Sequence, residues 1–300
     1  MPATGGHEGI TGAPPPSPVT GTGGAALGYR PRHTLPLLVE VRRQLTRRRT
    51  QAALGFLVVL PFLLVAAFKL GDDDESGAPG LVELATTGAA NFTLFTLFVS
   101  TGFLLVVIVA LFAGDTVASE ASWSSLRYLL AAPVPRSHLL RRKLTVALLY
   151  AAFALVLLPA VAYLAGGLFF GWEPLRNPLG GELAAGESVT RIAISVAYIG
   201  VSLLFVAGLG FLLSVWTDAP LGAVGGAVML VIVSNILDAV TALGGWRRLL
   251  PTHYAYAWTD TLTPEVTWNG MARGALVSVT YAVVLLAWAW RHFLRKDVTS

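Results

Sequence analysis

Six long apolar runs alternate with shorter polar segments along this chain of 300 residues. A helix that spans a membrane needs about 20 mostly apolar residues, and each run reaches that length. The pattern therefore predicts an all-α, polytopic membrane protein with six transmembrane helices. We expect these spans at about residues 51–70, 92–113, 144–170, 192–216, 221–243 and 271–290, with Pro61 as a kink in the first.

The polar segment before the first run, TLPLLVEVRRQLTRRRTQ, has the periodicity of an amphipathic helix. Leu38, Val41 and Leu45 recur at helical spacing on one face. The opposite face is polar and carries Glu40, Arg43, Gln44 and Arg47. A basic amphipathic helix lies in the headgroup plane, so we predict an N-terminal interfacial helix. The alternative is a basic stop signal that only fixes the topology.

Residues 1–33, ahead of this helix, have a composition that disfavours a folded structure. The first 28 are rich in Gly, Pro and Thr, and they lack the charged start and apolar core of a secretory signal peptide. We therefore expect a disordered cytoplasmic tail at 1–33 and a single six-helix transmembrane domain at 34–300.

The segment between the fifth and sixth runs is too polar to span a membrane but is rich in aromatic rings, which favour the membrane interface. These rings belong to Trp246, Tyr254, Tyr256, Trp258 and Trp268. We predict one or two short helices at the outer membrane surface, broken at Pro251 and Pro264. A plain extracellular loop is the alternative.

The charged residues, 13% of the chain, set the orientation of the spans. With both termini in the cytoplasm, 15 of the 21 Lys and Arg residues fall on the inner side, as the positive-inside rule requires. The cations cluster beside apolar runs rather than on one soluble face, so the net charge of +4 does not indicate a nucleic-acid partner. These features predict a multi-pass protein of the cell (plasma) membrane.

Motifs for catalysis or cofactor binding are missing from the sequence. Cysteine is absent, and there is no phosphate-binding loop, no H-E-x-x-H pair and no G-x-S-x-G elbow. We therefore expect no catalytic, metal-binding or cofactor-binding residues in this chain. Asp238 falls near the outer surface, where we expect it to be solvated. Closely spaced glycines predict tight helix packing within the chain rather than a dimer seam: Gly208, Gly210, Gly222 and Gly226.

A polar segment of residues 114–143, GDTVASEASWSSLRYLLAAPVPRSHLLRRK, connects the second and third spans in the cytoplasm. Its first half has helical spacing, with Glu120, Ser124 and Arg127 on one face, and Pro133 and Pro135 end the helix. Such a helix is either an inert interfacial hairpin or a docking element for a cytosolic protein.

This segment resembles the permease subunits of type-2 ATP-binding-cassette (ABC) exporters. Their pattern is an acid-x4-acid start, a small-small-Leu-Arg-x-Leu-Leu core, Pro-Val-x-Arg and a closing Lys. The matching residues here are Asp115, Glu120, Ser124, Ser125, Leu126, Arg127, Leu129, Leu130, Pro133, Val134, Arg136 and Lys143. The family more often has Gly-Thr where this chain has two serines. LLPTHYAYAW and the C-terminal FLRKDVTS also agree, so the resemblance covers about residues 35–300.

The resemblance implies a transmembrane subunit that pairs with a second copy or a close paralogue, each on a cytosolic ABC ATPase subunit that binds ATP and magnesium. The chain is then a transporter subunit and not an enzyme. The implied ATPase contact consists of Glu120, Trp123, Ser124, Arg127 and Arg136. The implied connecting helix at the membrane surface contains Leu38, Val41, Arg42 and Leu45. The outer helices that close the exit contain Trp246, His253, Tyr254 and Trp258.

Two other classes of function are compatible with the residues alone. An intramembrane enzyme would use His253 with Asp260 or Asp238. A non-transporting membrane scaffold or sensor would need no chemistry of its own.

Overall fold

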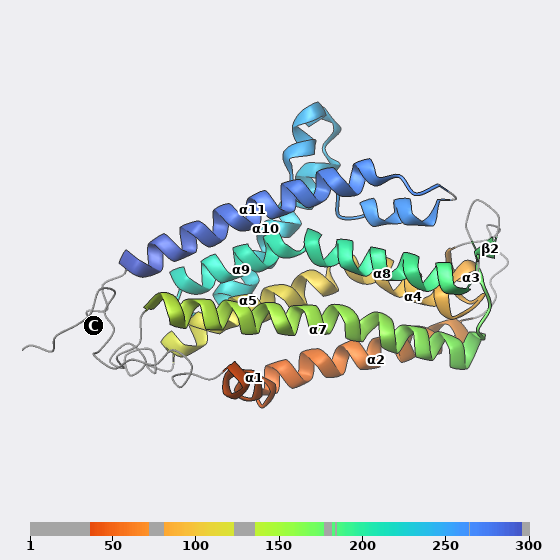
Figure 1. Cartoon of the computed structure of the whole chain (residues 1–300), viewed down its shortest axis with the longest axis horizontal. Helices are drawn as coiled ribbons and strands as arrows, with labels where there is room; N and C mark the ends of the chain where they lie inside the picture. Colours follow the sequence, from red (N-terminus) through yellow and green to blue (C-terminus); the bar gives the residue numbers. More distant parts are fainter. Residues whose placement is uncertain are drawn as a thin grey trace, which may run out of the picture.

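A computed structural model describes residues 37–71, 81–122, 136–176, 182–183, 185–263 and 265–295. The chain is all-α, and its long helices run side by side along one axis (Figure 1). The predicted tail at 1–33 lies outside the described residues. The long helices are α2 (Arg48–Leu70), α4 (Ala89–Thr101), α5 (Leu104–Ser122), α7 (Arg136–Phe170), α8 (Ala185–Ser202), α9 (Leu204–Trp216), α10 (Pro220–Ala239) and α11 (Trp268–Arg295).

Shorter elements lie at the two ends of this bundle. At one end, α1 (Leu37–Leu45) precedes α2; at the other, α3 (Leu81–Ala85) lies near a two-residue pairing of β1 (Leu175–Arg176) with β2 (Glu182–Leu183). Between α10 and α11 the chain forms two 3-10 helices, η1 (Thr241–Leu249) and η2 (Ala257–Leu262).

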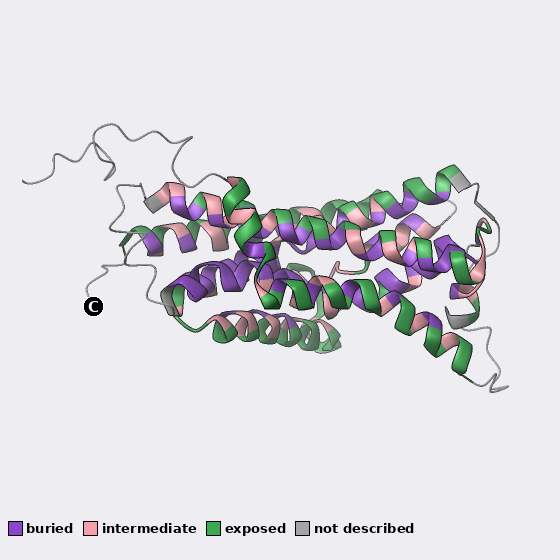
Figure 2. Cartoon of the chain, turned by 90° about the horizontal axis from the view of Figure 1, so that it is seen from below, coloured by how far each residue is buried: buried purple, intermediate pink, exposed green. Residues whose placement is uncertain are grey.

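In the described part of the chain, five helical stretches are long and apolar enough to cross a membrane, or six when α4 and α5 count as one bent span. The multi-span prediction is confirmed at this level, and every predicted run falls on one of these stretches. The outward faces of α2, α10 and α11 carry exposed apolar side chains over most of their length (Figure 2). Such faces suit contact with lipid, because hydrocarbon chains replace the water that would oppose their exposure.

The second predicted span is not one continuous helix. It divides into α4 and α5, which are bent by 59° at the break around Gly102. The hydroxyl of Tyr256 occupies this place: a Cβ atom on residue 102 would lie 2.5 Å from it. Glycine therefore makes room for a side chain from the segment between α10 and α11, residues 240–267, which we call the outer segment after its predicted place. A hydropathy pattern carries no sign of this contact.

Two predicted boundaries also need correction. Helix α5 continues without interruption from Leu104 to Ser122, so the second predicted span does not end near residue 113 but runs on into the cytoplasmic segment. The rest of the helix predicted in that segment lies outside the described residues. The fifth span ends at Ala239 rather than near residue 243, and η1 begins at Thr241. Within η1, Gly244 has φ of 50°, a left-handed conformation that side-chain-bearing residues rarely adopt, so the chain turns sharply there.

Close helix packing at glycines confirms part of the small-residue prediction. A Cβ on Gly208 would lie 3.2 Å from the α11 backbone at Ala282, and one on Gly210 would lie 3.3 Å from the α5 carbonyl of Ala110. Gly226 packs against α9, whereas Gly222 has neighbours only in the adjacent turn. Helix α9 is thus held tightly between α5 and α11, with α10 also packed on α5 and α9.

Candidate functional site

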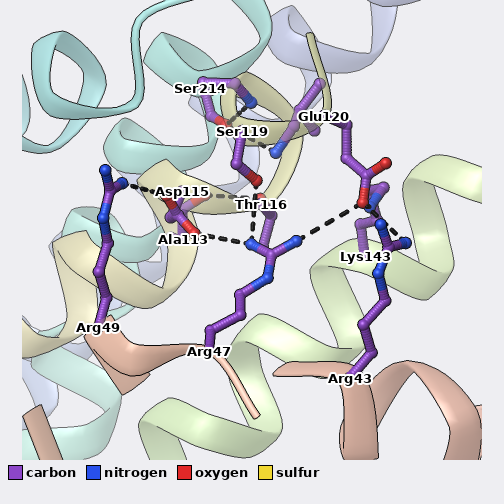
Figure 3. Close-up of polar contacts among 12 residues, drawn as sticks. Arg43, Arg47, Arg49, Ala113, Asp115, Thr116, Ser119, Glu120, Lys143 and Ser214 are labelled. Carbon is purple, nitrogen blue, oxygen red and sulfur yellow. Dashed lines mark hydrogen bonds and ion pairs between the residues drawn. The ribbon is translucent and has the colours of Figure 1, made fainter. Parts of the chain in front are cut away.

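Seven charged residues meet at the end of the bundle where α1, α2, α5 and α7 converge (Figure 3). The carboxylates come from α1 and α5, and the cations come from α1, α2, α7 and the turn between α1 and α2. We call this group the ionic cluster: Glu40, Arg43, Arg47, Arg49, Asp115, Glu120 and Lys143. Its members are separated by up to about a hundred positions in the chain, so it joins elements that the sequence keeps apart.

Glu120 is the most deeply buried carboxylate of the cluster. Its side chain is 1% exposed, and its Oε1 lies 3.1 Å from Lys143 Nζ and 3.1 Å from an Arg43 nitrogen. Lys143 is 4% exposed and also lies 3.3 Å from Glu40 Oε1. Charges buried to this degree are tolerated only when they are paired, because each ion loses several kcal/mol of hydration. Glu120 and Lys143 therefore depend on each other.

Arg47 bridges the two carboxylates of α5. It lies in the turn between α1 and α2, where the extended backbone directs the side chain to α5. Its Nη1 donates to Asp115 Oδ2 at 2.7 Å and to Ser119 Oγ at 2.9 Å, while Nη2 lies 3.6 Å from Glu120. Arg49 adds a 2.9 Å contact to the other oxygen of Asp115. The planar guanidinium fork suits such bridging, which a lysine could not reproduce.

Helix α1 is docked through its polar face. The Tyr150 hydroxyl of α7 donates to the Val41 carbonyl at 2.6 Å, and Glu40 pairs with Lys143. On the other side of α1, Leu38 is 81% exposed and Leu45 is 48% exposed. An amphipathic helix of a soluble protein would instead bury its apolar face and expose its polar face. Leu38 and Leu45 thus lie on the exposed side of α1, and its place at a membrane surface stays a prediction.

Ser214 of α9 holds the segment of α5 that carries both carboxylates. The backbone N–H groups of Val117 and Ala118 donate to Ser214 Oγ, each at 2.9 Å, and Thr116 Oγ1 donates to the Ala113 carbonyl at 2.7 Å. A hydroxyl inserted into the hydrogen-bond ladder of a helix locally reshapes it. The position of the carboxylates thus depends on α9, and nothing in the sequence pattern singles out this serine.

The ionic cluster joins α1 and the turn after it to α5 and α7 through paired charges. Its carboxylates are neutralised by cations, and the described residues contain no group of three or more His, Asp or Glu side chains arranged to hold a metal ion. What the cluster does is connect α1 to α5 and α7, the two helices that flank residues 123–135.

The predicted ATPase contact is only partly placed by the structure. The Glu120 carboxylate lies inside the ionic cluster, where it is 1% exposed and paired with Lys143, so its contact with an ATPase stays a prediction. Trp123, Ser124 and Arg127 lie outside the described residues. Arg136 begins α7, and its side chain is not described.

The predicted outer residues are spread over two elements. Trp246 is 73% exposed on η1, whereas Trp258 is 1% exposed on η2. His253 and Tyr254 lie in the turn between them, with their rings in an edge-on contact at 4.7 Å between centroids. Partial burial raises the pKa of the neighbouring Tyr256, so its hydroxyl beside Gly102 stays protonated near neutral pH.

Asp238 was expected to be solvated, but its carboxylate contacts two side chains. Its Oδ1 lies 2.6 Å from His253 Nδ1 and 3.5 Å from Arg247 Nε. One helical turn earlier, the hydroxyl of Ser234 lies 2.7 Å from that of Thr252. These two contacts attach the turn after η1 to the end of α10.

Arg191 is a structural residue that sequence reasoning missed. Its side chain is buried and donates to the carbonyls of Thr261 at 2.6 Å and Thr263 at 2.5 Å. Glu187, one turn away on α8, holds the guanidinium at 2.7 Å. The Tyr198 hydroxyl adds a bond to the Tyr254 carbonyl at 2.7 Å. The outer segment is therefore attached to α8 as well as to α10.

Comparison with known proteins places the chain in a family. The sequence pattern of a family described as a protein of unknown function (DUF2705) matches residues 80–299, well over half of the chain. The chain belongs to this family. The DUF2705 match includes Asp115, Glu120 and Lys143 and begins after the arginines of α1 and α2.

A relative among known proteins is the uncharacterized protein YhcI of Bacillus subtilis (strain 168). The two chains are 26% identical over 234 residues, which cover 71% of this chain and 68% of YhcI.

Proposed function

We propose that this chain is the permease subunit of an ATP-driven ABC exporter, energised by a separate cytosolic ATPase. The sequence lacks a phosphate-binding loop, so ATP and magnesium belong in the partner chain. The order of residues from Asp115 to Lys143 resembles the type-2 exporter pattern over the segment between the second and third spans. In this proposal both termini are cytoplasmic, the protein lies in the plasma membrane, and a second copy or paralogue completes the transporter.

The observation that carries the proposal is the ionic cluster. Residues 123–135, which hold most of the proposed docking residues, are flanked directly by the α5 and α7 segments that supply Glu120 and Lys143. In this proposal, a partner bound to residues 123–135 moves at least one of these helices. Because Arg43 and Arg47 bind the same carboxylates, the displacement also reaches α1 and the start of α2. The cluster thus offers a route from a cytosolic partner into the bundle.

The outer segment is connected to the ionic cluster through α5 and α10. Helix α5 packs on α9 and α10, and α10 carries Asp238, which binds the turn at His253. Tyr256 of the same outer segment meets the α4–α5 break at Gly102. In the proposed cycle, ATP binding by the partner shifts α5, and the outer segment follows through these two contacts.

Co-purification tests the docking part of this proposal. The chain is expressed with a candidate ABC ATPase from the same organism, and Arg127→Glu is compared with Arg291→Glu, which reverses one exposed charge on α11. We expect Arg127→Glu to reduce recovery of the ATPase while Arg291→Glu retains it. Equal recovery with both variants argues against docking at this segment, and failure of the unaltered chain to retain the ATPase argues against the whole proposal.

The Asp238–His253 pair favours one alternative, an intramembrane enzyme. A carboxylate at 2.6 Å from Nδ1 orients an imidazole as in base-assisted catalysis. In the described residues, however, no hydroxyl is recorded within hydrogen-bond distance of the other ring nitrogen. His253→Ala separates the two functions: an enzyme loses turnover with no change in ATPase recovery, whereas a transporter keeps its partner and has no hydrolytic activity to lose.

A further inference from the structure

A cationic cavity lies beside the ionic cluster, on the other side of α7. It has a volume of about 240 Å³ and is lined by Leu37, His138, Arg141, Arg142 and Thr145. Among the described residues, the lining contains two arginines, a histidine and no carboxylate. Arg142 Nε donates to His138 Nε2 at 3.4 Å, which ties two of the lining side chains together.

These arginines are not part of the ionic cluster. Lys143, the next residue, is buried and points to Glu120, so Arg141 and Arg142 fall on a different face of α7. Among the described residues, no carboxylate forms an ion pair with either arginine. The cavity therefore concentrates positive charge that the protein itself leaves uncompensated in its described part.

An exposed apolar strip continues from this cavity along α7. Thr145, Leu149, Phe153 and Val156 follow at intervals of three or four residues, and all four side chains are exposed. At 1.5 Å per residue, the distance from Thr145 to Val156 is about 16 Å. That is about half of the ~30 Å hydrocarbon core of a bilayer, so the strip matches the depth of one leaflet.

We propose that this cavity binds the phosphate headgroup of an anionic phospholipid, with an acyl chain along the strip from Leu149 to Val156. Guanidinium groups bind phosphate oxygens in a fork, and charge-assisted bonds of this kind are among the strongest available. Basic pockets at the cytoplasmic ends of transmembrane helices are suited to such headgroups. A free phosphate ion would satisfy the arginines but would leave the apolar strip unused.

The bound lipid has a structural consequence for α1. Leu37 of α1 lines the cavity together with α7, so a headgroup there contacts both helices. The ionic cluster holds α1 from the polar face, and the lipid holds it from the membrane side. This site does not depend on the transport function, because it requires only that the basic end of α7 lies at the membrane surface.

Native mass spectrometry of the full chain in detergent tests the site. The protein is titrated with phosphatidylglycerol or with zwitterionic phosphatidylcholine, and the double variant Arg141→Gln/Arg142→Gln is compared with Arg291→Gln/Arg295→Gln. The control also removes two positive charges, but from exposed positions of α11, near the same end of the bundle as the start of α7 (Figure 1). We expect phosphatidylglycerol to bind roughly tenfold or more weakly to the first variant, because two charge-assisted bonds are lost. The control should stay within about twofold of the unaltered protein, since its arginines lie outside the cavity.

A second variant separates loss of the site from loss of the fold. Thr145→Trp fills the cavity but keeps all of its charges, so it should also weaken phosphatidylglycerol binding while leaving the melting temperature without lipid nearly unchanged. The proposal is overturned if the α11 control weakens phosphatidylglycerol binding as much as Arg141→Gln/Arg142→Gln does. It is also overturned if the unaltered protein binds phosphatidylcholine as tightly as phosphatidylglycerol. Displacement of the lipid by inorganic phosphate at matched concentration would identify a phosphate site instead, and the lipid assignment would be wrong.

Discussion

Replacing Glu120 by Gln removes the charge at the centre of the ionic cluster while keeping the size of the side chain. Lys143 and one nitrogen of Arg43 each lie 3.1 Å from Glu120 Oε1. At an effective dielectric constant of about 20, each contact corresponds to about 5 kcal/mol of Coulomb attraction before desolvation is subtracted. Breaking a buried pair by removing one partner typically costs about 3–5 kcal/mol. Glu40 still lies 3.3 Å from Lys143, so we expect the lower end, about 3 kcal/mol.

Thermal unfolding of the purified protein in detergent measures this loss. By the scaling of domains of 150–250 residues, about 3 kcal/mol lowers the melting temperature by about 6–12 °C. Glu83→Gln is the matched control, because Glu83 is an exposed carboxylate of α3, away from the cluster. It should leave the melting temperature nearly unchanged.

A compensating variant shows whether the buried pair is the cause. Glu120→Leu/Lys143→Met removes both charges and fills the space with apolar atoms, so it should recover at least half of the stability lost in Glu120→Gln. The reasoning is refuted if Glu120→Gln melts at the same temperature as Glu83→Gln, because a carboxylate that is 1% exposed and paired as the structure has it cannot be lost without effect.

Two other substitutions test contacts that position the ends of the bundle. Ser214→Ala removes the hydroxyl that accepts from two buried N–H groups of α5 and should destabilise the protein by about 2 kcal/mol in thermal unfolding. Ser278→Ala, which removes a buried hydroxyl with no hydrogen-bond partner among the described residues, should have almost no effect. Arg191→Met removes two charge-assisted bonds, one of them to Thr261, and should speed limited proteolysis of the outer segment roughly tenfold or more. Arg273→Met, on the exposed side of α11, should leave the cleavage rate unchanged. Equal cleavage rates in the two variants contradict the proposed attachment.

Hydropathy was sufficient for the approximate place of the long apolar helices, because about 20 apolar residues can satisfy their backbone groups in a membrane only as helices. It could not locate the break at Gly102, which depends on the Tyr256 hydroxyl from a segment about 150 residues later. The end of α10 at Ala239 was missed for a similar reason. Apolar residues continue to Leu243, and the turn is fixed by the contact of Asp238 with His253.

The sequence predicted two charged groups of the ionic cluster separately, but not that they contact each other. The polar face of α1, with Glu40, Arg43 and Arg47, and the acidic pair of α5 were both recognised, but each was expected to face outward. Whether a charge lies at a surface or in a buried pair depends on which opposite charge the fold brings to it. That pairing joins residues 68 or more positions apart, and local periodicity carries no information at such a separation. Ser214 was undetectable because a lone serine in an apolar helix has no distinctive pattern.

The central claim is that the ionic cluster transmits ATP-driven movement from a cytosolic partner to the outer segment. The most direct measurement uses Glu120→Leu/Lys143→Met in proteoliposomes together with the partner ATPase. A cysteine introduced in place of the exposed Trp246 reports, by its labelling rate, whether the outer segment moves when ATP is added. We predict that the variant retains the ATPase but shows no ATP-dependent change in labelling, whereas the protein with an intact cluster does. An unchanged ATP response in the variant would contradict the account.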